Sequence, residues 1–150
     1  MQIIKIDKTQ GFLVYGLFDK YRIFYKQPSD IEIARDFIQT RLDSNESVIF
    51  TALTNDGIPV GFTQLYPKYS SMRVSKNWIL NDLYVEKVYR QQGIGGQLIK
   101  AAMDFARQNG ATFVELSTAI DNYTAQNLYE QIGFARQPQE TDFFTYRISI

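Results

Sequence analysis

The residues best suited to chemistry in this sequence form a glycine-rich turn past mid-chain. An apolar, strand-like stretch, Trp78 to Val85, leads into the turn, and an amphipathic, helix-like stretch follows it directly. Glycine has no Cβ, so the backbone can curl until several amide N–H groups and the positive end of the next helix point at one anion. The sequence therefore predicts a phosphate-binding turn made of Arg90, Gln91, Gln92, Gly93, Ile94, Gly95 and Gly96.

Spacing separates the ligand classes that use a strand, a glycine turn and a helix. The P-loop pattern is absent, because no Gly-Lys-Ser/Thr sequence follows the turn. A dinucleotide fingerprint that began at Gly93 would need its third glycine at Leu98, and it would normally follow the first strand of the chain. We therefore interpret Glu115, twenty residues after Gly95, as unrelated to ribose binding. A nucleotide-binding enzyme is the weakest of the alternatives.

Two motifs together resemble the GNAT superfamily of N-acetyltransferases. The pattern Arg-x-x-Gly-x-Gly begins at Arg90, and Asn-x-x-Ala-x-x-x-Tyr runs from Asn122 to Tyr129, overlapping the segment Leu128–Phe134. The resemblance covers essentially the whole chain and is closest to small bacterial members. It implies one N-acetyltransferase domain over residues 1–150, with a mixed α/β fold whose splayed, mostly antiparallel sheet is flanked by helices. It also implies acetyl-CoA as the cosubstrate and an amine as the acceptor.

The resemblance further assigns binding roles. Acetyl-CoA would enter between two diverging parallel strands, here Trp78–Val85 and Thr112–Ser117, and a bulge in the first would free backbone groups from the sheet. Those groups, on Leu83, Tyr84 and Val85, would pair with the pantetheine arm. Asn122 would hydrogen-bond the pantetheine near the thioester. The pyrophosphate would be held by the amides of Gln91, Gln92, Gly93, Ile94, Gly95 and Gly96, with a further contact from the Arg90 guanidinium.

Acetylation of an amine requires a proton acceptor for the amine and a proton donor for the departing thiolate. By the resemblance Tyr129 is the donor, because a phenol that titrates near about 10 can give a proton to a thiolate whose thiol titrates near about 8.5. The alternative is that Tyr129 only packs beside Leu128 and Ile132. Asp82 is the candidate base, since aromatic neighbours would bury it and raise its pKa. A purely structural carboxylate and a water relay remain alternatives.

The acceptor pocket has no motif of its own, so the identity of the amine stays open. In this superfamily the first two helices and the following hairpin line that pocket. A noncatalytic acyl-CoA-binding sensor is the competing function, and the terminal stretch Phe143–Ile150 could complete a sheet or join two copies into a homodimer. The residues that we expect near the acceptor are Tyr21, Tyr25, Gln27, Asp30, Gln64 and Tyr66.

Hydrophobic periodicity predicts that one α/β unit positions these residues. We expect a helix that ends at Pro28, and Ser29 and Asp30 are good N-caps for a second helix. The stretch around Lys68–Lys76 is polar and predicts a loop, and a helix should end at Asn109-Gly110. The expected strands are Gln2–Ile6, Val48–Leu53, Ile58–Tyr66, Trp78–Val85, Thr112–Ser117 and Phe143–Ile150; a short helix holds Ala125 to Ile132.

Composition narrows the chemistry further. Sixteen basic residues balance sixteen acidic ones, so no basic surface favours nucleic acid, and no apolar run is long enough to cross a membrane. The chain has no cysteine and no histidine, which excludes a cysteine nucleophile, a Ser-His-Asp triad and imidazole metal ligands. We expect no metal and a cytoplasmic location.

Overall fold

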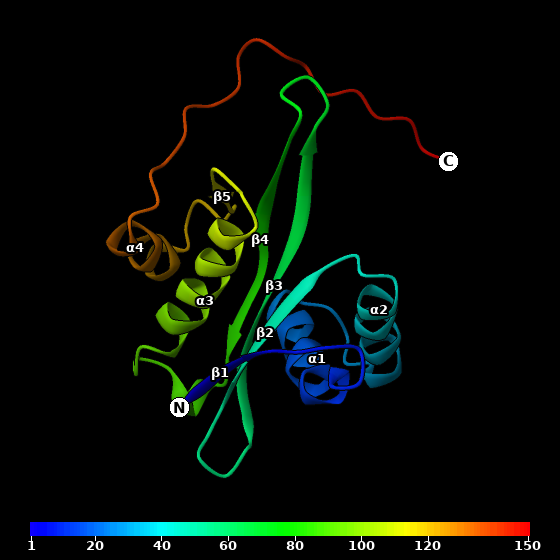
Figure 1. Ribbon diagram of the computed structural model, residues 1–150, viewed down its shortest axis with the longest axis vertical. Coiled ribbons are helices and arrows are strands. Elements are labelled where there is room, and N and C mark those ends of the chain that lie inside the picture. The colour runs from blue at the N-terminus through cyan, green and yellow to red at the C-terminus, as the bar shows by residue number, and fades with distance from the viewer. The chain divides into compact units, whose positions relative to one another are not determined.

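The computed structural model describes residues 1–150 and contains two compact units, Met1–Ser117 and Thr118–Ile150 (Figure 1). The first unit holds a five-stranded sheet with three α-helices, and the second holds one α-helix. The strands of the first unit are β1 (Gln2–Lys5), β2 (Val48–Leu53), β3 (Pro59–Ser70), β4 (Ser75–Val85) and β5 (Val114–Glu115). The helices are η1 (Gly11–Leu13), α1 (Tyr15–Phe24), α2 (Ile31–Asp43), η2 (Lys87–Tyr89), α3 (Ile94–Gln108) and α4 (Tyr123–Ile132).

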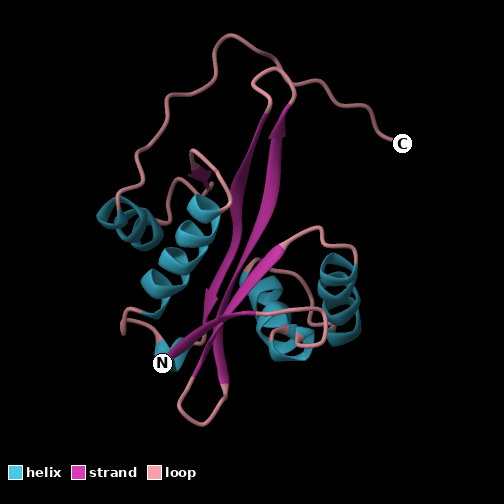
Figure 2. Ribbon diagram, viewed as in Figure 1, coloured by secondary structure: helices cyan, strands magenta, loops and turns pink.

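The strands, magenta in Figure 2, form one sheet, and their order in it is the chain order β1-β2-β3-β4-β5. Neighbours are antiparallel except β4 and β5, which are parallel. The predicted mixed α/β fold with a mostly antiparallel sheet is therefore confirmed. No helix has both the length and the apolar character needed to cross a membrane, and the cytoplasmic location stays a prediction.

The predicted loop around Lys68–Lys76 is wrong for most of its length. β3 continues to Ser70, β4 begins at Ser75, and only the residues between them form the turn. The stretch is polar because it forms the exposed end of a long hairpin, where cross-strand side chains pair. The Lys76 ammonium, for example, lies 5.5 Å from the ring centre of Tyr69, its partner across the hairpin, and 4.9 Å from that of Trp78.

Helices α1 and α2 cover one face of the sheet (Figure 1). Asp30 caps α2 as predicted, since its Oδ1 accepts a hydrogen bond from the amide of Ile33 at 3.1 Å. The other cap candidate, Ser29, instead donates its hydroxyl to the Asp19 carboxylate at 2.7 Å. The buried side chains of this layer are Ile6, Val14, Leu17, Phe18, Ala34, Ile38, Ile49 and Phe62.

Helix α3 covers the opposite face of the sheet (Figure 1). Its Phe105 ring packs edge-on against Phe50 on β2 and Trp78 on β4, with ring centres 6.0 and 5.3 Å apart. The predicted apolar face is confirmed, because Leu98, Ala102 and Ala106 are buried, and the helix ends at the predicted Asn109-Gly110 position. Packing of this apolar face against the sheet holds the start of α3 directly after the glycine turn.

Two predicted strands differ from the structure. The strand expected at Thr112–Ser117 is shortened to β5. At its start, Oδ1 of Asn77 accepts hydrogen bonds from the amides of Thr112 and Phe113 at 2.7 and 3.1 Å, and these replace the sheet pairing there. The strand expected at Phe143–Ile150 is absent, and that stretch has no regular structure. A strand needs a neighbour for its amides and carbonyls, and none pairs with this stretch.

Candidate active site

A β-bulge in β4 determines which face of the sheet Asp82 occupies. Trp78 and Leu80 belong to the α3 face, and strict alternation would place Asp82 there too. Asn81, however, is an extra residue with no partner on β3, and Asp82 pairs with Gln64. The bulge thus moves the carboxylate to the face that α1 and α2 cover. The family resemblance predicts a bulge in this strand, and the pairing shows it.

The Asp82 carboxylate is buried but hydrogen-bonded on both oxygens. Only 2% of the residue is exposed. The Asn81 side-chain amide donates to Oδ1 at 2.8 Å, and the Gln64 amide donates to Oδ2. Burial disfavours the charged form and raises the pKa of Asp82, and the two amide hydrogen bonds oppose that rise. A carboxylate with a raised pKa inside a polar cluster is suited to accept a proton.

Two tyrosines from different elements complete this cluster. Tyr21 on α1 donates its hydroxyl to the backbone oxygen of Asn81 at 3.3 Å. Burial, with the nearby Asp82 charge, raises the pKa of Tyr21 and of Tyr66 well above the ordinary value for a phenol. Both hydroxyls therefore stay protonated and can serve as hydrogen-bond donors beside the carboxylate.

The residues expected near the acceptor divide into two groups. Tyr21, Gln64 and Tyr66 gather around Asp82, and the ring of Tyr25 contacts that of Tyr21 with centres 4.9 Å apart. Asp30 serves as the α2 cap, and the backbone amide of Gln27 bonds to the end of α1, so neither shows a contact with the cluster.

Sequence reasoning missed Ser47. Its hydroxyl donates to Oε1 of Gln64 at 2.7 Å, and the residue is 6% exposed. A single serine before a strand carries no pattern, so only the pairing of β2 with β3 could reveal it.

The strand that carries Asp82 also has an open edge. β5 pairs with β4 only at Trp78 and Ile79, so the rest of β4 has no neighbouring strand on that side. The open part includes Leu83, Tyr84 and Val85, the residues predicted to pair with pantetheine. The carbonyl of Val85 already accepts a hydrogen bond from Nε of Arg90 at 2.8 Å, and the Arg90 guanidinium lies 5.5 Å from the ring centre of Tyr84.

The N-terminus of α3 has no side-chain cap. Gly93 is the N-cap, in a left-handed conformation with φ of 80°, and Gln91 is also left-handed with φ of 62°. α1 also has no side-chain cap, whereas Asp30 and Asn122 cap the first turns of α2 and α4. The first amides of a helix have no partner within the helix. In α3 those of Ile94, Gly95 and Gly96 are therefore left for a ligand.

The space around this turn fits the predicted phosphate. A Cβ built on Gly93 or Gly96 would meet no atom within 4 Å, so both backbones face open space. The Gln92 side chain bonds back to the carbonyl of Val88 at 3.3 Å and does not fill that space. Uncapped amides, the helix dipole and a neighbouring open strand edge form a donor set suited to the pyrophosphate and pantetheine of acetyl-CoA.

The second unit carries the two other predicted site residues. Asn122 caps α4, because its Oδ1 accepts from the amide of Ala125 at 3.2 Å. Tyr129 is half-buried on α4, and its ring contacts that of Phe134 with centres 6.0 Å apart. The helix ends at Ile132, the last residue of the predicted helix, and Gly133 is its C-cap. The roles of Asn122 and Tyr129 toward acetyl-CoA stay predictions.

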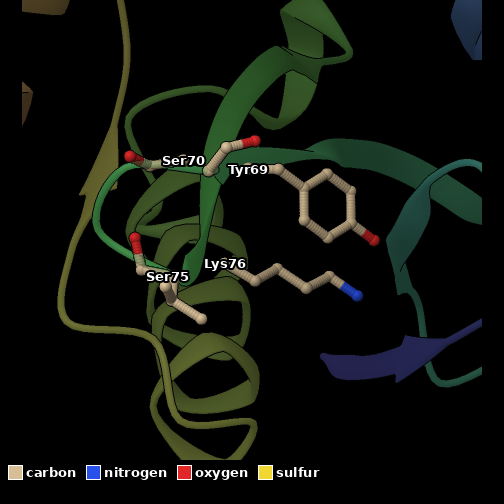
Figure 3. Close-up of a pocket in the computed structure, with 6 residues that line it drawn as sticks. Tyr69, Ser70, Ser75 and Lys76 are labelled. Carbon is tan, nitrogen blue, oxygen red and sulfur yellow. The ribbon is translucent and has the colours of Figure 1, made fainter.

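A separate hollow of about 540 Å³ lies at the far end of the β3–β4 hairpin (Figure 3). Figure 3 shows the side chains of Tyr69 and Lys76 side by side on its wall. None of the predicted site residues lines this hollow. It lies at the start of β4, whereas the glycine turn follows the end of that strand. We therefore do not assign the reaction to this hollow.

Comparison with known proteins agrees with the geometry. Residues 14–134 match the Acetyltransferase (GNAT) family. A Bacillus subtilis protein described as "uncharacterized N-acetyltransferase YhfO" is 41% identical over 150 residues, which is 100% of this chain and 98% of the relative. A "probable acetyltransferase" of Haemophilus influenzae is 29% identical over 95% of this chain and 96% of its own length.

Solved structures give the same result. The crystal structure of a probable acetyltransferase has a TM-score of 0.89 and 41% identity, with 99% of each chain covered. The structure of AAC(6')-Iy with the bisubstrate analog CoA-S-monomethyl-acetylneamine has a TM-score of 0.76 over 98% of each chain. At 20% identity, that second likeness shows the fold alone.

Proposed function

The chain belongs to the acetyltransferase (GNAT) family, and from this premise we propose that it acetylates a primary amine of a small molecule or peptide by direct attack within a ternary complex. It is an acetyl-CoA-dependent N-acetyltransferase. The observation that carries the proposal lies on β4, which presents a buried carboxylate at its bulge and continues from there as an open edge toward the uncapped end of α3. One strand can thus position a proton acceptor and the cosubstrate together.

We assign the binding roles accordingly. The amides of residues 91–96 hold the pyrophosphate, supported by the dipole of α3, and Arg90 adds positive charge beside them. The open edge of β4 at Leu83–Val85 pairs with the pantetheine arm, and the amide group of Asn122 adds a hydrogen bond near the thioester. Bound acetyl-CoA supplies an activated acyl group.

The chain's own residues then move the protons. Asp82 accepts the proton that the amine loses as its nitrogen bonds to the acetyl carbon. The C–S bond breaks, and the Tyr129 hydroxyl gives a proton to the sulfur, so that the products are an amide and free coenzyme A. Tyr129 regains its proton from solvent, and Asp82 releases the one it took.

Release of free thiol from acetyl-CoA tests this function. The purified chain is assayed against polyamines, amino sugars, amino acids and peptides with free amines. We expect turnover with at least one class, and initial-velocity plots that intersect because both substrates bind before reaction. Parallel plots would exclude direct attack, and tight coenzyme A binding without turnover on any amine would point to a noncatalytic sensor.

Gly96→Ala is expected to weaken coenzyme A binding about fivefold, or about 1 kcal/mol. The new Cβ extends into the open space where phosphate oxygens approach, although the free protein tolerates it because no atom lies within 4 Å. Calorimetric titration with coenzyme A measures the change. Gly16→Ala is the matched control, since Gly16 is an α1 glycine with the same open surroundings, and its substitution should leave the affinity intact. Equal affinities in both variants would contradict the phosphate site.

We also infer that residues 1–150 act as one acetyltransferase domain, because the family match spans both units.

We further infer that two copies form a homodimer through the terminal stretch Phe143–Ile150. Its sequence alternates as in a strand, so pairing between two copies would place four apolar side chains, each 83% or more exposed in the single chain, on one face. That face consists of Phe144, Tyr146, Ile148 and Ile150.

Light scattering should give about twice the chain mass of 17.4 kDa for the native protein. Ile148→Asp should shift this mass to that of a monomer, because a charge on the apolar face opposes pairing. Ser149→Asp places the same charge on the other face and should remain dimeric. A monomeric native protein, or equal behaviour of the two variants, would contradict this interface.

A further inference from the structure

Three polar side chains form a buried chain across three neighbouring strands. Ser47 precedes β2, Gln64 lies on β3 and Asp82 on β4. The Ser47 hydroxyl donates to Oε1 of Gln64 at 2.7 Å, and Nε2 of Gln64 donates to Oδ2 of Asp82. The exposed fractions are 6, 0 and 2%. In such a buried network, a polar group left without its hydrogen bond lowers the stability of the fold.

The direction of these hydrogen bonds depends on the charge of Asp82. An ionised carboxylate only accepts, so the Gln64 amide must turn its NH₂ group toward it. Its carbonyl oxygen then faces Ser47 and accepts a hydrogen bond from the hydroxyl. The reverse orientation would bring the Gln64 carbonyl against the carboxylate, which is tolerable only if Asp82 is protonated. The Ser47 hydroxyl donates to Oε1 of Gln64 and so anchors the amide in the orientation that an ionised Asp82 selects.

Other groups around Asp82 are either neutral or more distant. Asn81 on β4 donates to Oδ1, and Tyr21 on α1 and Tyr66 on β3 face the carboxylate with protonated hydroxyls. The charged neighbours Arg41 and Glu46 act on Tyr66 and pair with each other at 3.5 Å. No cation contacts Asp82 directly, so hydrogen bonds have to offset its burial.

We propose that Ser47 and Gln64 are positioning residues that keep Asp82 ionised and aimed, so that it can receive the proton of the acceptor amine. The part that concerns the amine rests on the proposed function. Gln64 acts on the carboxylate directly, and Ser47 acts through Gln64 by fixing its amide. Neither residue needs to touch the substrate.

The pKa of Asp82 can be measured without catalysis, by NMR titration of its side-chain carboxyl carbon in the full chain, with Asp82→Asn to assign the signal. Gln64→Met keeps a long unbranched side chain but loses the donor, and should raise the pKa of Asp82 by about one unit. Ser47→Ala leaves Oε1 of Gln64 without its hydrogen bond, so the amide is held less firmly and the pKa of Asp82 should rise by a smaller amount. An unchanged pKa in both variants overturns the proposal.

Thr51→Val is the matched control. Thr51 is equally buried, and its hydroxyl donates to the carbonyl of Gly61 at 2.8 Å, with no contact to Asp82. The variant loses a buried hydrogen bond from the same sheet and should leave the pKa of Asp82 as it is in the native chain. A rise equal to that of Gln64→Met would mean that the shift reflects general loosening of the sheet, against the proposal.

The pH dependence of kcat/KM distinguishes this inference from the proposed function on which it rests. If Asp82 is the base, the acidic limb moves to higher pH in Gln64→Met by the same amount as the pKa measured by NMR. If the pKa rises while the limb stays in place, Ser47 and Gln64 do position the carboxylate, but Asp82 does not take the amine proton.

Discussion

Replacing Asp82 with asparagine is expected to lower kcat/KM for the amine about a hundredfold at neutral pH, the usual contribution of a positioned general base. The asparagine side chain has similar size but cannot accept the amine proton. Binding of coenzyme A should change little, because the phosphate site lies beyond the end of β4, in the turn before α3 and at the N-terminus of that helix. A full pH–rate profile of both proteins measures the effect.

The sign of the pH dependence follows from the raised pKa of Asp82. The native rate should climb with pH as Asp82 loses its proton, above the ordinary carboxyl value of 3.8. The Asp82→Asn rate lacks this limb and follows only the ionisation of the amine, so the two rates approach each other at low pH, where Asp82 of the native protein is protonated and likewise cannot accept the amine proton. If the variant keeps the native profile, water is the proton acceptor and Asp82 is a structural carboxylate.

Asp19→Asn is the matched control for this experiment. Asp19 on α1 is also buried, at 7% exposed, and accepts hydrogen bonds from Ser29 and the amide of Asp30. These hydrogen bonds, the one from Ser29 first, lower the pKa of Asp19. Its loss should reduce stability without removing the acidic limb of the rate.

Stability measurements distinguish the two carboxylates as well. Asp19 stabilises the fold above its unfolded pKa, and this contribution is lost as the pH falls through its lowered folded pKa. Asp82 has the opposite sign, because the folded chain holds its proton more tightly than the unfolded chain. Its contribution declines as the pH rises from 3.8 through the raised folded pKa. Urea unfolding across pH should show both trends, each removed by its own asparagine variant.

The sequence alone predicts the features whose determinants lie close together along the chain. The glycine turn and the α3 stretch contain their own determinants, since backbone freedom at Gly93 and an apolar face every three to four residues require no distant partner. The same holds for Asp30, which caps α2 through an amide only three residues away.

Non-local pairing decided the features that the sequence left open. Alternation from Trp78 and Leu80 would place Asp82 on the α3 face, and only the unpaired Asn81 in the β3–β4 register reverses it. Ser47 enters the site through its bond to Gln64, which lies on the next strand. The shortening of β5 likewise depends on a side chain far away in sequence. Composition at these positions cannot specify which strands become neighbours.

Tyr129→Phe is expected to cut turnover at least tenfold while the affinity for acetyl-CoA stays nearly intact. The hydroxyl is the proposed proton donor to the leaving thiolate, and the substitution removes it alone. Turnover under saturating substrates measures the loss, and calorimetry with acetyl-CoA measures affinity. An unchanged kcat for the true amine would falsify the role.

The choice of phenylalanine separates the two interpretations of this residue. If Tyr129 only packs on α4, its ring contact with Phe134 survives in Tyr129→Phe, and the enzyme should keep its full activity. Tyr123→Phe removes a hydroxyl from the same helix at a side chain that is 69% exposed, and should be silent in either case. A loss confined to Tyr129→Phe therefore reports on the proton of that hydroxyl, because ring, helix and cosubstrate binding are all retained.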